Sequence, residues 1–212
     1  MVKMKFKIAK DGLPIIGFFI LVTFLSAFFH ISVSVIFLIL LSFCIFFFRD
    51  PEREITKGEN IVLAPADGKV VAIKQIQDSK ISDEPVNRIS IFLSIFDVHI
   101  NRAPVDGEIV YLEYSKGRFL DARNPKASEV NENNFMVLSH KGAKIAIRQI
   151  AGKIARRVVC KCKKGDNLKI GERIGMIKFG SRTDLFLPVN AKINTKIGDI
   201  VKAGITIMGE VT

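Results

Sequence analysis

One long uncharged stretch constrains the fold of this chain more than any other feature. It runs from Gly12 to Phe48 and contains no Asp, Glu, Lys or Arg. A single helix over Leu13–Phe48 would be about 54 Å long, far more than the ~30 Å hydrocarbon core of a bilayer. The least apolar part surrounds His30 and divides the stretch into Leu13–Phe29 and Ile31–Phe48, each about 25 Å long as a helix. The stretch therefore predicts a helical hairpin in a membrane, with His30 at its turn.

Basic residues flank this hairpin on both sides. They are Lys3, Lys5, Lys7 and Lys10 before it, and Arg49, Arg53 and Lys57 after it. The positive-inside rule then places both ends in the cytoplasm, which a hairpin satisfies and a single span does not. A cleaved signal peptide is disfavoured because the stretch is too long and no small-residue cleavage site follows. We expect residues 1–48 to anchor the chain in the cytoplasmic membrane, with the remainder on the cytoplasmic side.

The charge of the whole chain points to an anionic partner. Lys and Arg number 32 against 21 Asp and Glu, a formal net charge of +11. Such a surplus favours either nucleic acid or an anionic lipid surface. The sequence has no Trp and only two Tyr, so it lacks the basic, aromatic-rich stripe on which single strands stack. Together with the apolar stretch, this favours lipid and predicts no nucleic-acid binding.

Residues 49–212 show the pattern of a β protein. Short runs of β-branched residues alternate with Asp-Gly turns. Two segments recur within the chain: Ala64–Val70 returns as Ala103–Ile109, and Lys163–Ile177 returns as Lys196–Val211. The glycine spacing of the second pair resembles the hairpins of biotinyl/lipoyl-type β-sandwiches. We expect a mainly β fold, a sandwich or barrel-like core of related hairpins with minor helix, preceded by the apolar helical hairpin.

The three cysteines do not predict a metal site. Cys44 lies inside the apolar stretch, where it acts as a small hydrophobic residue. Cys160 and Cys162 form a C-x-C pair, and no second Cys/His cluster accompanies them. The pattern favours two residues on one face of a strand, continued by Val158.

Three polar residues could together form a catalytic set. Asp67 stands in an Asp-Gly turn, His99 ends an apolar strand, and Ser181 follows Gly180 in the apolar frame MIKFGSRTDLFLP. Each alone is unremarkable. Together they allow a Ser–His–Asp arrangement, in which the histidine takes the hydroxyl proton and the aspartate fixes its tautomer. His140, at a predicted hairpin turn, is a second candidate for the base.

Five motifs, in order, carry a resemblance to a known family. They are RDPER (Arg49–Arg53), APADGKV (Ala64–Val70), FDVHINRAPVDG (Phe96–Gly107), the loop KGRF…KASEVNENN (116–134) and FGSR (Phe179–Arg182). With the apolar hairpin in front of them, the chain closely resembles the phosphatidylserine decarboxylases in their short form. The resemblance covers nearly the whole chain.

This resemblance implies a proenzyme that cuts its own Gly180–Ser181 bond. The Ser181 hydroxyl would attack the Gly180 carbonyl, and elimination from the resulting ester would leave a pyruvoyl group in place of Ser181. The products would be a large chain, 1–180, and a small chain, 181–212. By the same resemblance His99 is the base and Asp67 orients it; Asp67 is preferred to its echo Asp106 by family position alone.

The implied activity is the decarboxylation of phosphatidylserine to phosphatidylethanolamine. The substrate amine would form a Schiff base with the pyruvoyl group, which takes the electron-sink role of pyridoxal phosphate. The group that returns a proton stays open between His99, a water molecule, and Asn131 or Asn133 in the 116–134 loop. The family also suggests a homo-oligomer, a dimer, in an anionic membrane.

Two other functions remain open from the sequence. The glycine repeats would also suit a membrane-anchored biotinyl/lipoyl-like adaptor, although the modifiable lysine of such carriers is missing. A membrane serine hydrolase using Ser181 is the other. Either would be a single intact chain, whereas the proenzyme would become two.

Overall fold

The computed structural model describes residues 7–118, 120, 127–152, 157–178 and 181–211. The chain forms two compact units, Met1–Glu52 and Arg53–Thr212. Because each unit has its own interior, each is described by itself.

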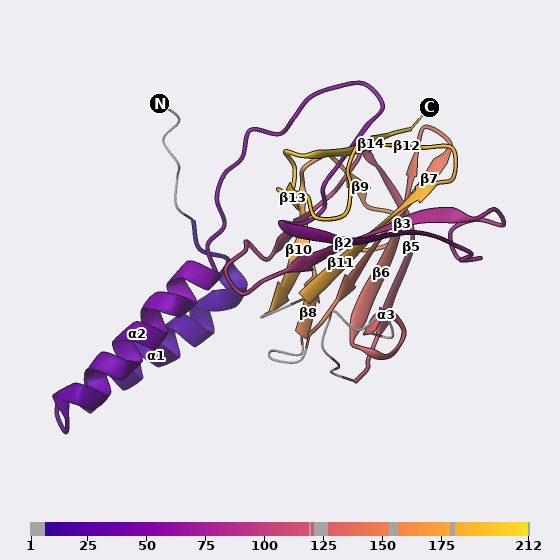
Figure 1. The fold of residues 1–212 in the computed structure, drawn as a ribbon. Helices are drawn as coiled ribbons and strands as arrows, with labels where there is room; N and C mark the ends of the chain where they lie inside the picture. The colour runs from indigo at the N-terminus through magenta and orange to yellow at the C-terminus, as the bar shows by residue number, and fades with distance from the viewer. Residues whose placement is uncertain (1–6, 119, 121–126, 153–156, 179–180, 212) are drawn as a thin grey trace. The chain divides into compact units, whose positions relative to one another are not determined.

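The first unit is the predicted helical hairpin. A short 3₁₀ turn, η1 (Lys10–Gly12), leads into α1 (Leu13–Ala27), and α2 (Ile31–Phe47) packs against α1 (Figure 1). Pro14 occupies the first turn of α1, where its missing N–H leaves no helical bond unmade. The helices separate at His30, as predicted. His30 has an extended backbone, and its carbonyl accepts hydrogen bonds from the N–H groups of Val33 and Ser34.

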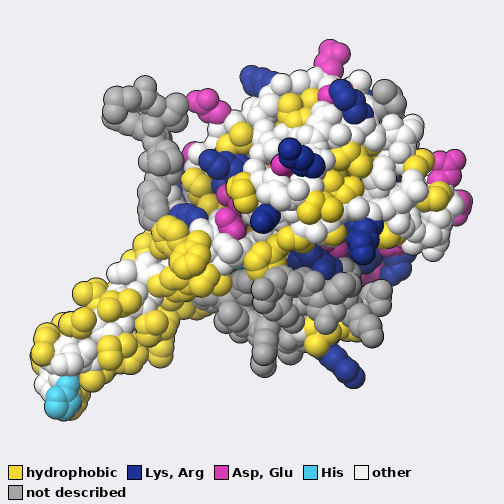
Figure 2. Space-filling view, in the orientation of Figure 1, with side chains coloured by type: hydrophobic (Ala, Val, Ile, Leu, Met, Phe, Trp, Pro, Cys, Tyr) yellow, Lys and Arg dark blue, Asp and Glu magenta, His cyan; other side chains and the backbone are white. Residues whose placement is uncertain are grey.

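Apolar side chains cover the outside of this hairpin. Phe29 is 81% exposed and Ile31 is 71% exposed, and yellow side chains run along both helices in Figure 2. The few hydroxyls bond internally: Ser34 Oγ donates to the carbonyl of Thr23 at 3.0 Å. Apolar groups outside and satisfied polar groups inside suit a lipid environment. Lys10–Ala27 is long and apolar enough to cross a membrane, and α2 is shorter.

The second unit is mainly β, which confirms the predicted fold class. Its eight-stranded sheet has the order β13-β2-β3-β11-β7-β6-β5-β9, beside two three-stranded sheets, β4-β10-β8 and β1-β14-β12. Every strand pair within the three sheets is antiparallel. The strands are β1 (Ile61–Leu63), β2 (Gly68–Ile76), β3 (Val86–Leu93), β4 (Ile100–Arg102), β5 (Gly107–Ser115), β6 (Asn133–His140), β7 (Ala143–Ile150), β8 (Arg157–Cys160), β9 (Asn167–Leu168), β10 (Arg173–Lys178), β11 (Ser181–Pro188), β12 (Lys192–Ile193), β13 (Ile200–Val201) and β14 (Ile207–Glu210), with one short helix, α3 (Ala127–Val130).

The internal echoes of the sequence form equivalent structures. Gly171 N–H donates to the carbonyl of Ala103 at 2.8 Å, and Gly204 N–H donates to the carbonyl of Ala64 at 2.9 Å. Both glycines have positive φ, 78° and 73°, a conformation that side chains with a Cβ rarely adopt. The Ala103–Ile109 segment therefore pairs with the Lys163–Ile177 segment, and the Ala64–Val70 segment pairs in the same way with the Lys196–Val211 segment. The unit thus contains an internal repeat.

The core lies on one face of the eight-stranded sheet. Ile89 and Ile91 of β3, Ile147 of β7 and Leu185 of β11 are completely or almost completely buried there, together with Leu187. A smaller cluster on the opposite face contains Phe135 and Phe186, whose rings meet edge to face. The alternation of strand side chains assigns each residue of β11 to one of these two faces.

Candidate active site

Ser181 is the first residue of a central strand. β11 lies between β3 and β7, and Ser181 pairs with Leu93 of β3. Ser181 is completely buried, and among the residues that the structure describes its Oγ has no hydrogen-bond partner. Because buried hydroxyls almost always have a partner, this one calls for an explanation. Gly180, the predicted partner in cleavage, lies outside the described residues.

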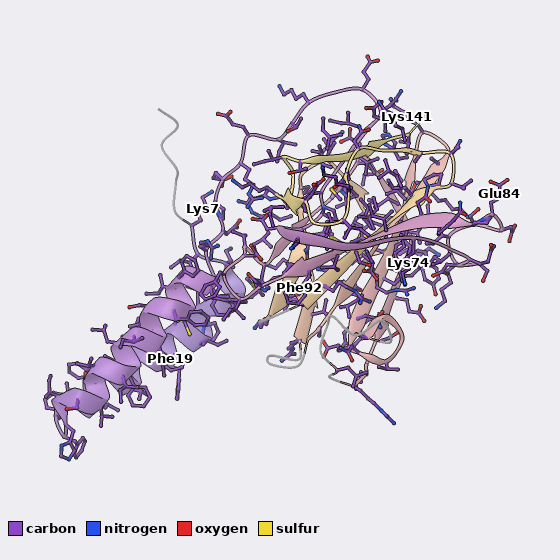
Figure 3. The ribbon with its side chains drawn as sticks, in the orientation of Figure 1. Lys7, Phe19, Lys74, Glu84, Phe92 and Lys141 are labelled. Carbon is purple, nitrogen blue, oxygen red and sulfur yellow. The ribbon has the colours of Figure 1, made fainter. Side chains whose placement is uncertain are left out.

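Ser181 and Thr183 face the core side of the sheet. They alternate with Arg182 and continue the row that Leu185 and Leu187 form further along β11. The Ser181 hydroxyl therefore lies at one end of the hydrophobic core. Figure 3 shows this end of the sheet at Phe92, next to Leu93 on β3, and the opposite end at the hairpin that carries Glu84.

His99 is also completely buried, immediately before β4. Its Nδ1 lies 3.0 Å from the carbonyl oxygen of Asp97. A carbonyl only accepts, so Nδ1 carries a proton, and in the neutral imidazole the lone pair is then on Nε2. The turn that presents this carbonyl is itself fixed, since Asp97 Oδ2 accepts from both the N–H and the hydroxyl of Ser94, each at 2.7 Å. This contact fixes which ring nitrogen of a neutral His99 could act as a general base, namely Nε2.

Two contacts bring His99 to the Ser181 end of the core. The His99 carbonyl accepts from the N–H of Ile177, near the end of β10 that leads to Ser181. Asn101, two residues after His99, donates from Nδ2 to Thr183 Oγ1 at 3.2 Å. The segment from His99 to Asn101 therefore reaches both the end of β10 and the first half of β11.

A buried polar chain extends from this contact, and the sequence reasoning missed it. Gln149 Nε2 donates to Asn101 Oδ1 at 2.8 Å, and Asn134 Nδ2 donates to Gln149 Oε1 at 3.2 Å. With Thr183, these side chains form a network that we call the polar relay: Thr183, Asn101, Gln149 and Asn134, all nearly or fully buried. The sequence does place a polar residue at an inward position of each of these apolar strands. It does not show that the four strands bring the four side chains together.

Asp67 forms a buried ion pair with Arg53 and also accepts a backbone hydrogen bond. Arg53 donates to both of its carboxylate oxygens at 2.6 Å, and Ala203 N–H donates to Oδ1 at 2.8 Å. Its echo, Asp106, accepts in the same way from the N–H of Ile170 at 2.8 Å. The two aspartates are equivalent turn anchors, and the Arg53 pair distinguishes Asp67. That Asp67 orients His99 stays a prediction; here the Asp97 carbonyl holds the imidazole.

Asn131 and Asn133 are engaged in holding their own segment. Asn131 donates to the carbonyls of Leu120 and Ala151 and accepts from Leu120 N–H, each at 2.8 Å. Asn133 Nδ2 donates to the carbonyl of Asn131 at 2.9 Å. These bonds tie the end of the predicted loop to the end of β7. The loop residues 119 and 121–126 lie outside the described residues.

His140 is separated from Ser181 by the length of a strand. It ends β6, whereas Asn134 of the polar relay lies near the start of that strand. Its Nδ1 lies 2.6 Å from the carbonyl oxygen of Asp106. The structure therefore separates His140 from Ser181, and the choice of His99 as the base stays a prediction.

The opposite face of β11 carries a buried ion pair next to the serine. Arg182 Nε lies 3.0 Å from Asp184 Oδ1, and both side chains are almost completely buried. Burial lowers the pKa of the Arg182 guanidinium from its ordinary value, while the carboxylate of Asp184 opposes this shift. The first residues of β11 are thus polar on both faces.

The C-x-C pair lies beside the far end of the polar relay. β8 ends at Cys160, so Cys162 falls just beyond the strand, and both pack on the main core. They line a cavity of about 510 Å³ together with Asn134. Hydrogen bonds from Cys162 and Asn134 lower the pKa of the Cys160 thiol to about 7, against a raising effect of burial. Within the described ranges no three His, Cys, Asp or Glu side chains gather into a metal-binding group.

Known proteins resemble this chain along almost its whole length. The profile of a family described as phosphatidylserine decarboxylase matches residues 40–209. The phosphatidylserine decarboxylase proenzyme of Magnetococcus marinus is 44% identical over 205 residues, which cover 95% of this chain and 94% of that protein. The proenzymes of Desulfotalea psychrophila and Syntrophus aciditrophicus are 40% and 43% identical, and the alignments cover 96% and 95% of this chain and 96% of each relative. By sequence, the chain therefore belongs to the phosphatidylserine decarboxylase family.

Proposed function

We propose that this decarboxylase cleaves itself between Gly180 and Ser181, and that the pyruvoyl group formed from Ser181 converts phosphatidylserine to phosphatidylethanolamine. The observation that carries the proposal is the Ser181 hydroxyl, completely buried and without a hydrogen-bond partner among the described residues. An unpaired buried hydroxyl costs about 1–3 kcal/mol. A serine that is consumed during maturation explains why that cost is tolerated. The relatives named above are also called proenzymes.

The position of Ser181 suits a group that must remain after cleavage. The small chain would contain β11, β12, β13 and β14. β11 is paired on both sides, β13 pairs with β2, and β14 pairs with β1. A new N-terminus at residue 181 would therefore stay fixed at the end of the core without its peptide link to the large chain.

In the first step His99 Nε2 takes the proton of Ser181 Oγ. The oxygen attacks the carbonyl carbon of Gly180, the bond to the Ser181 nitrogen breaks, and that nitrogen takes up the proton. An ester thus replaces the amide. The complete burial of Ser181 and His99 keeps bulk water from hydrolysing this ester.

The second step removes the proton from Cα of Ser181 and expels the Gly180 carboxylate. The resulting enamine of residue 181 takes up water and releases ammonia, which leaves a ketone. The conversion of the enamine to the ketone consumes one water molecule and releases one ammonia. We assign these proton transfers to His99, which is completely buried.

Once formed, the ketone would supply an electron sink for the electron pair that remains on the substrate when CO2 leaves. The chain's own residues position that chemistry. The polar relay holds Thr183, and with it the start of β11, through Asn101 and Gln149. His99 keeps its exchangeable proton site, Nε2, at the same end of the core because its Nδ1 is committed to the Asp97 carbonyl.

The decisive test is the intact mass of the purified protein beside Ser181→Ala and a matched control, Ser139→Ala, in β6. We expect the wild type and Ser139→Ala to give two chains split after Gly180, the small one lighter than its sequence mass by one ammonia. Ser181→Ala should stay a single chain and form no phosphatidylethanolamine from phosphatidylserine. A single full-length mass for the wild type would contradict self-cleavage. A single chain whose Ser181 reacts with a fluorophosphonate would indicate the hydrolase instead.

We further propose that the β unit works on the cytoplasmic side of the membrane. Lys7 and Lys10 before the hairpin and Arg49 after it support this orientation by the positive-inside rule. An epitope placed after Thr212 should be digested by protease in inside-out vesicles and protected in intact spheroplasts. The reverse pattern would contradict the orientation.

A further inference from the structure

Apolar side chains are unusually exposed at one corner of the β unit. Ile197 is 62% exposed and Ile200 is 70% exposed, and Val71 on the neighbouring strand is 39% exposed. Phe96, in the turn between β3 and β4, is 64% exposed. In water such a group of large apolar residues is unfavourable, which indicates a surface that is covered by something else in use.

Strand register places these residues on one edge of the sheet. Ile200 pairs with Lys69, and Lys69 pairs with Phe92, so β13, β2 and β3 lie side by side at this point. Val70 exchanges backbone hydrogen bonds with Gly198 and Asp199, which brings Val71 next to the Ile197 turn. We call this surface the β13 corner: Val71, Ile197 and Ile200, the lysines Lys69, Lys196 and Lys202, and Phe96 in the adjoining turn.

The charges of the β13 corner are basic. Lys69, Lys196 and Lys202 are all exposed. The carboxylates beside them are engaged locally: Asp199 accepts from Thr195 and from Lys196 N–H, and Asp97 accepts from Ser94. Figure 2 shows apolar and basic side chains interspersed where Figure 1 labels β2 and β13. Apolar groups between lysines are typical of a surface that binds an anionic lipid layer.

The β13 corner lies at the same end of the sheet as Ser181. Phe92 pairs with Lys69 on one side and with Arg182 on the other, one residue from Ser181. From β13 through β2 and β3 to β11 is three strand spacings, about 14 Å. A bilayer in contact with this corner would bring lipid headgroups to the end of the core where the serine lies.

We propose that the β13 corner is a second membrane-docking surface, independent of the helical hairpin, which inserts its apolar side chains into an anionic bilayer. Its purpose rests on the proposed function, because it would deliver a headgroup to Ser181. Its existence does not depend on self-cleavage. The occupant follows from charge complementarity and from the hairpin, which already places the chain at a membrane.

The absence of Trp from the sequence allows a direct test with single-Trp reporters. The full chain, carrying Ser181→Ala so that cleavage plays no part, is mixed with vesicles containing brominated lipids. Ile200→Trp and Phe96→Trp report on the corner, and Phe18→Trp reports on the hairpin. Val189→Trp is the matched control, since Val189 is as exposed as Val71 but follows the opposite end of β11.

We expect Ile200→Trp and Phe96→Trp to shift to shorter emission wavelength and to be quenched severalfold more than Val189→Trp. The effect should be larger with phosphatidylglycerol-containing vesicles than with pure phosphatidylcholine. Quenching of the corner reporters no greater than that of Val189→Trp would overturn the proposal, whatever Phe18→Trp shows. Equal quenching in both lipids would overturn its anionic selectivity.

A second experiment separates docking from catalysis. The double variant Ile197→Ser, Ile200→Ser should self-cleave normally, because both side chains are exposed and distant from the relay. We expect its rate on phosphatidylserine in vesicles to fall severalfold and its rate on monomeric short-chain phosphatidylserine to be unchanged. Equal rates of variant and wild type on vesicles would overturn the docking role. Failure of both proteins to cleave would instead contradict the proposed function.

Discussion

The two halves of β11 differ sharply although they belong to one continuous strand. In the first half, Ser181 and Thr183 face the core side, and Arg182 and Asp184 face the other side; all four are polar and nearly or fully buried. In the second half, Leu185, Phe186 and Leu187 are apolar and completely buried. Between the same two neighbours, β3 and β7, one strand thus has a buried polar half and a buried apolar half.

The difference shows how this fold combines stability with chemistry. The second half supplies hydrophobic burial through Ile89 and Ile147, which pair with Leu185. The first half replaces apolar contacts with hydrogen bonds, and buried polar groups are tolerated only when nearly all are satisfied. The relay satisfies Thr183, and Asp184 balances Arg182, while the Ser181 hydroxyl is left for reaction. The following changes test this division, from the largest expected effect to the smallest.

Breaking the ion pair should destabilise the protein most. Asp184→Ala removes one member of a buried ion pair, and breaking such a pair costs about 3–5 kcal/mol. Urea unfolding in detergent should show a loss of this size. The double variant Arg182→Met, Asp184→Leu should recover most of it, because no charge is then left buried. A double variant as unstable as Asp184→Ala would contradict the explanation.

Shortening the apolar half should cost stability without affecting maturation. Leu185→Ala leaves a cavity beside Ile89 and Ile147, and such changes cost about 2–5 kcal/mol. We expect lower stability in urea but two chains in the mass spectrum, as for the wild type. Loss of self-cleavage at a temperature where the variant is still folded would show that the apolar half of β11 is also needed for maturation.

Breaking the polar relay should slow self-cleavage, at a smaller cost in stability than Leu185→Ala. Asn101→Leu leaves Thr183 and Gln149 without their shared partner, which costs about 1–3 kcal/mol. We expect self-cleavage to slow at least tenfold, because Thr183 no longer fixes the start of β11. The matched control is Asn87→Leu, whose side chain bonds the carbonyl of Pro188 at the other end of the strand. Equal cleavage rates for the two variants would contradict a positioning role for the relay.

The smallest effect concerns the thiol at the far end of the relay. Because hydrogen bonds from Cys162 and Asn134 lower the pKa of Cys160 to about 7, its thiolate should increase from about half at neutral pH to nearly all two pH units higher. In a Cys44→Ser background, alkylation of Cys160 by iodoacetamide should be half-maximal near pH 7. Cys162→Val should move this midpoint to higher pH. An unchanged midpoint would exclude Cys162 as the cause.

The hairpin and the β class were predictable because local pattern decides them. An uncharged stretch as long as Gly12–Phe48 has no soluble surface to present, so it must form apolar helices. Recurrent Asp-Gly turns between β-branched runs give antiparallel strands, and the echoes did become equivalent, mutually paired turns.

The surroundings of the site were not predictable in the same way. Asn101, Thr183, Gln149 and Asn134 come from four strands whose order in space is not their order in the chain. The Arg53 pair with Asp67, and the Asp97 carbonyl that fixes the tautomer of His99, likewise depend on how distant turns meet.

The sequence by itself determined the apolar helical hairpin, the mainly β fold, the family and the residue at which the reaction is expected to begin. Each of these depends on the order of residues along the chain: hydrophobic length, periodicity and motifs. Only the tertiary structure decided which polar groups form the relay beside Ser181 and which exposed residues form the β13 corner. Those depend on strand register and on crossing sheets, because a hydrogen bond or a surface patch is made by residues that are close in space, however far apart they lie in the chain.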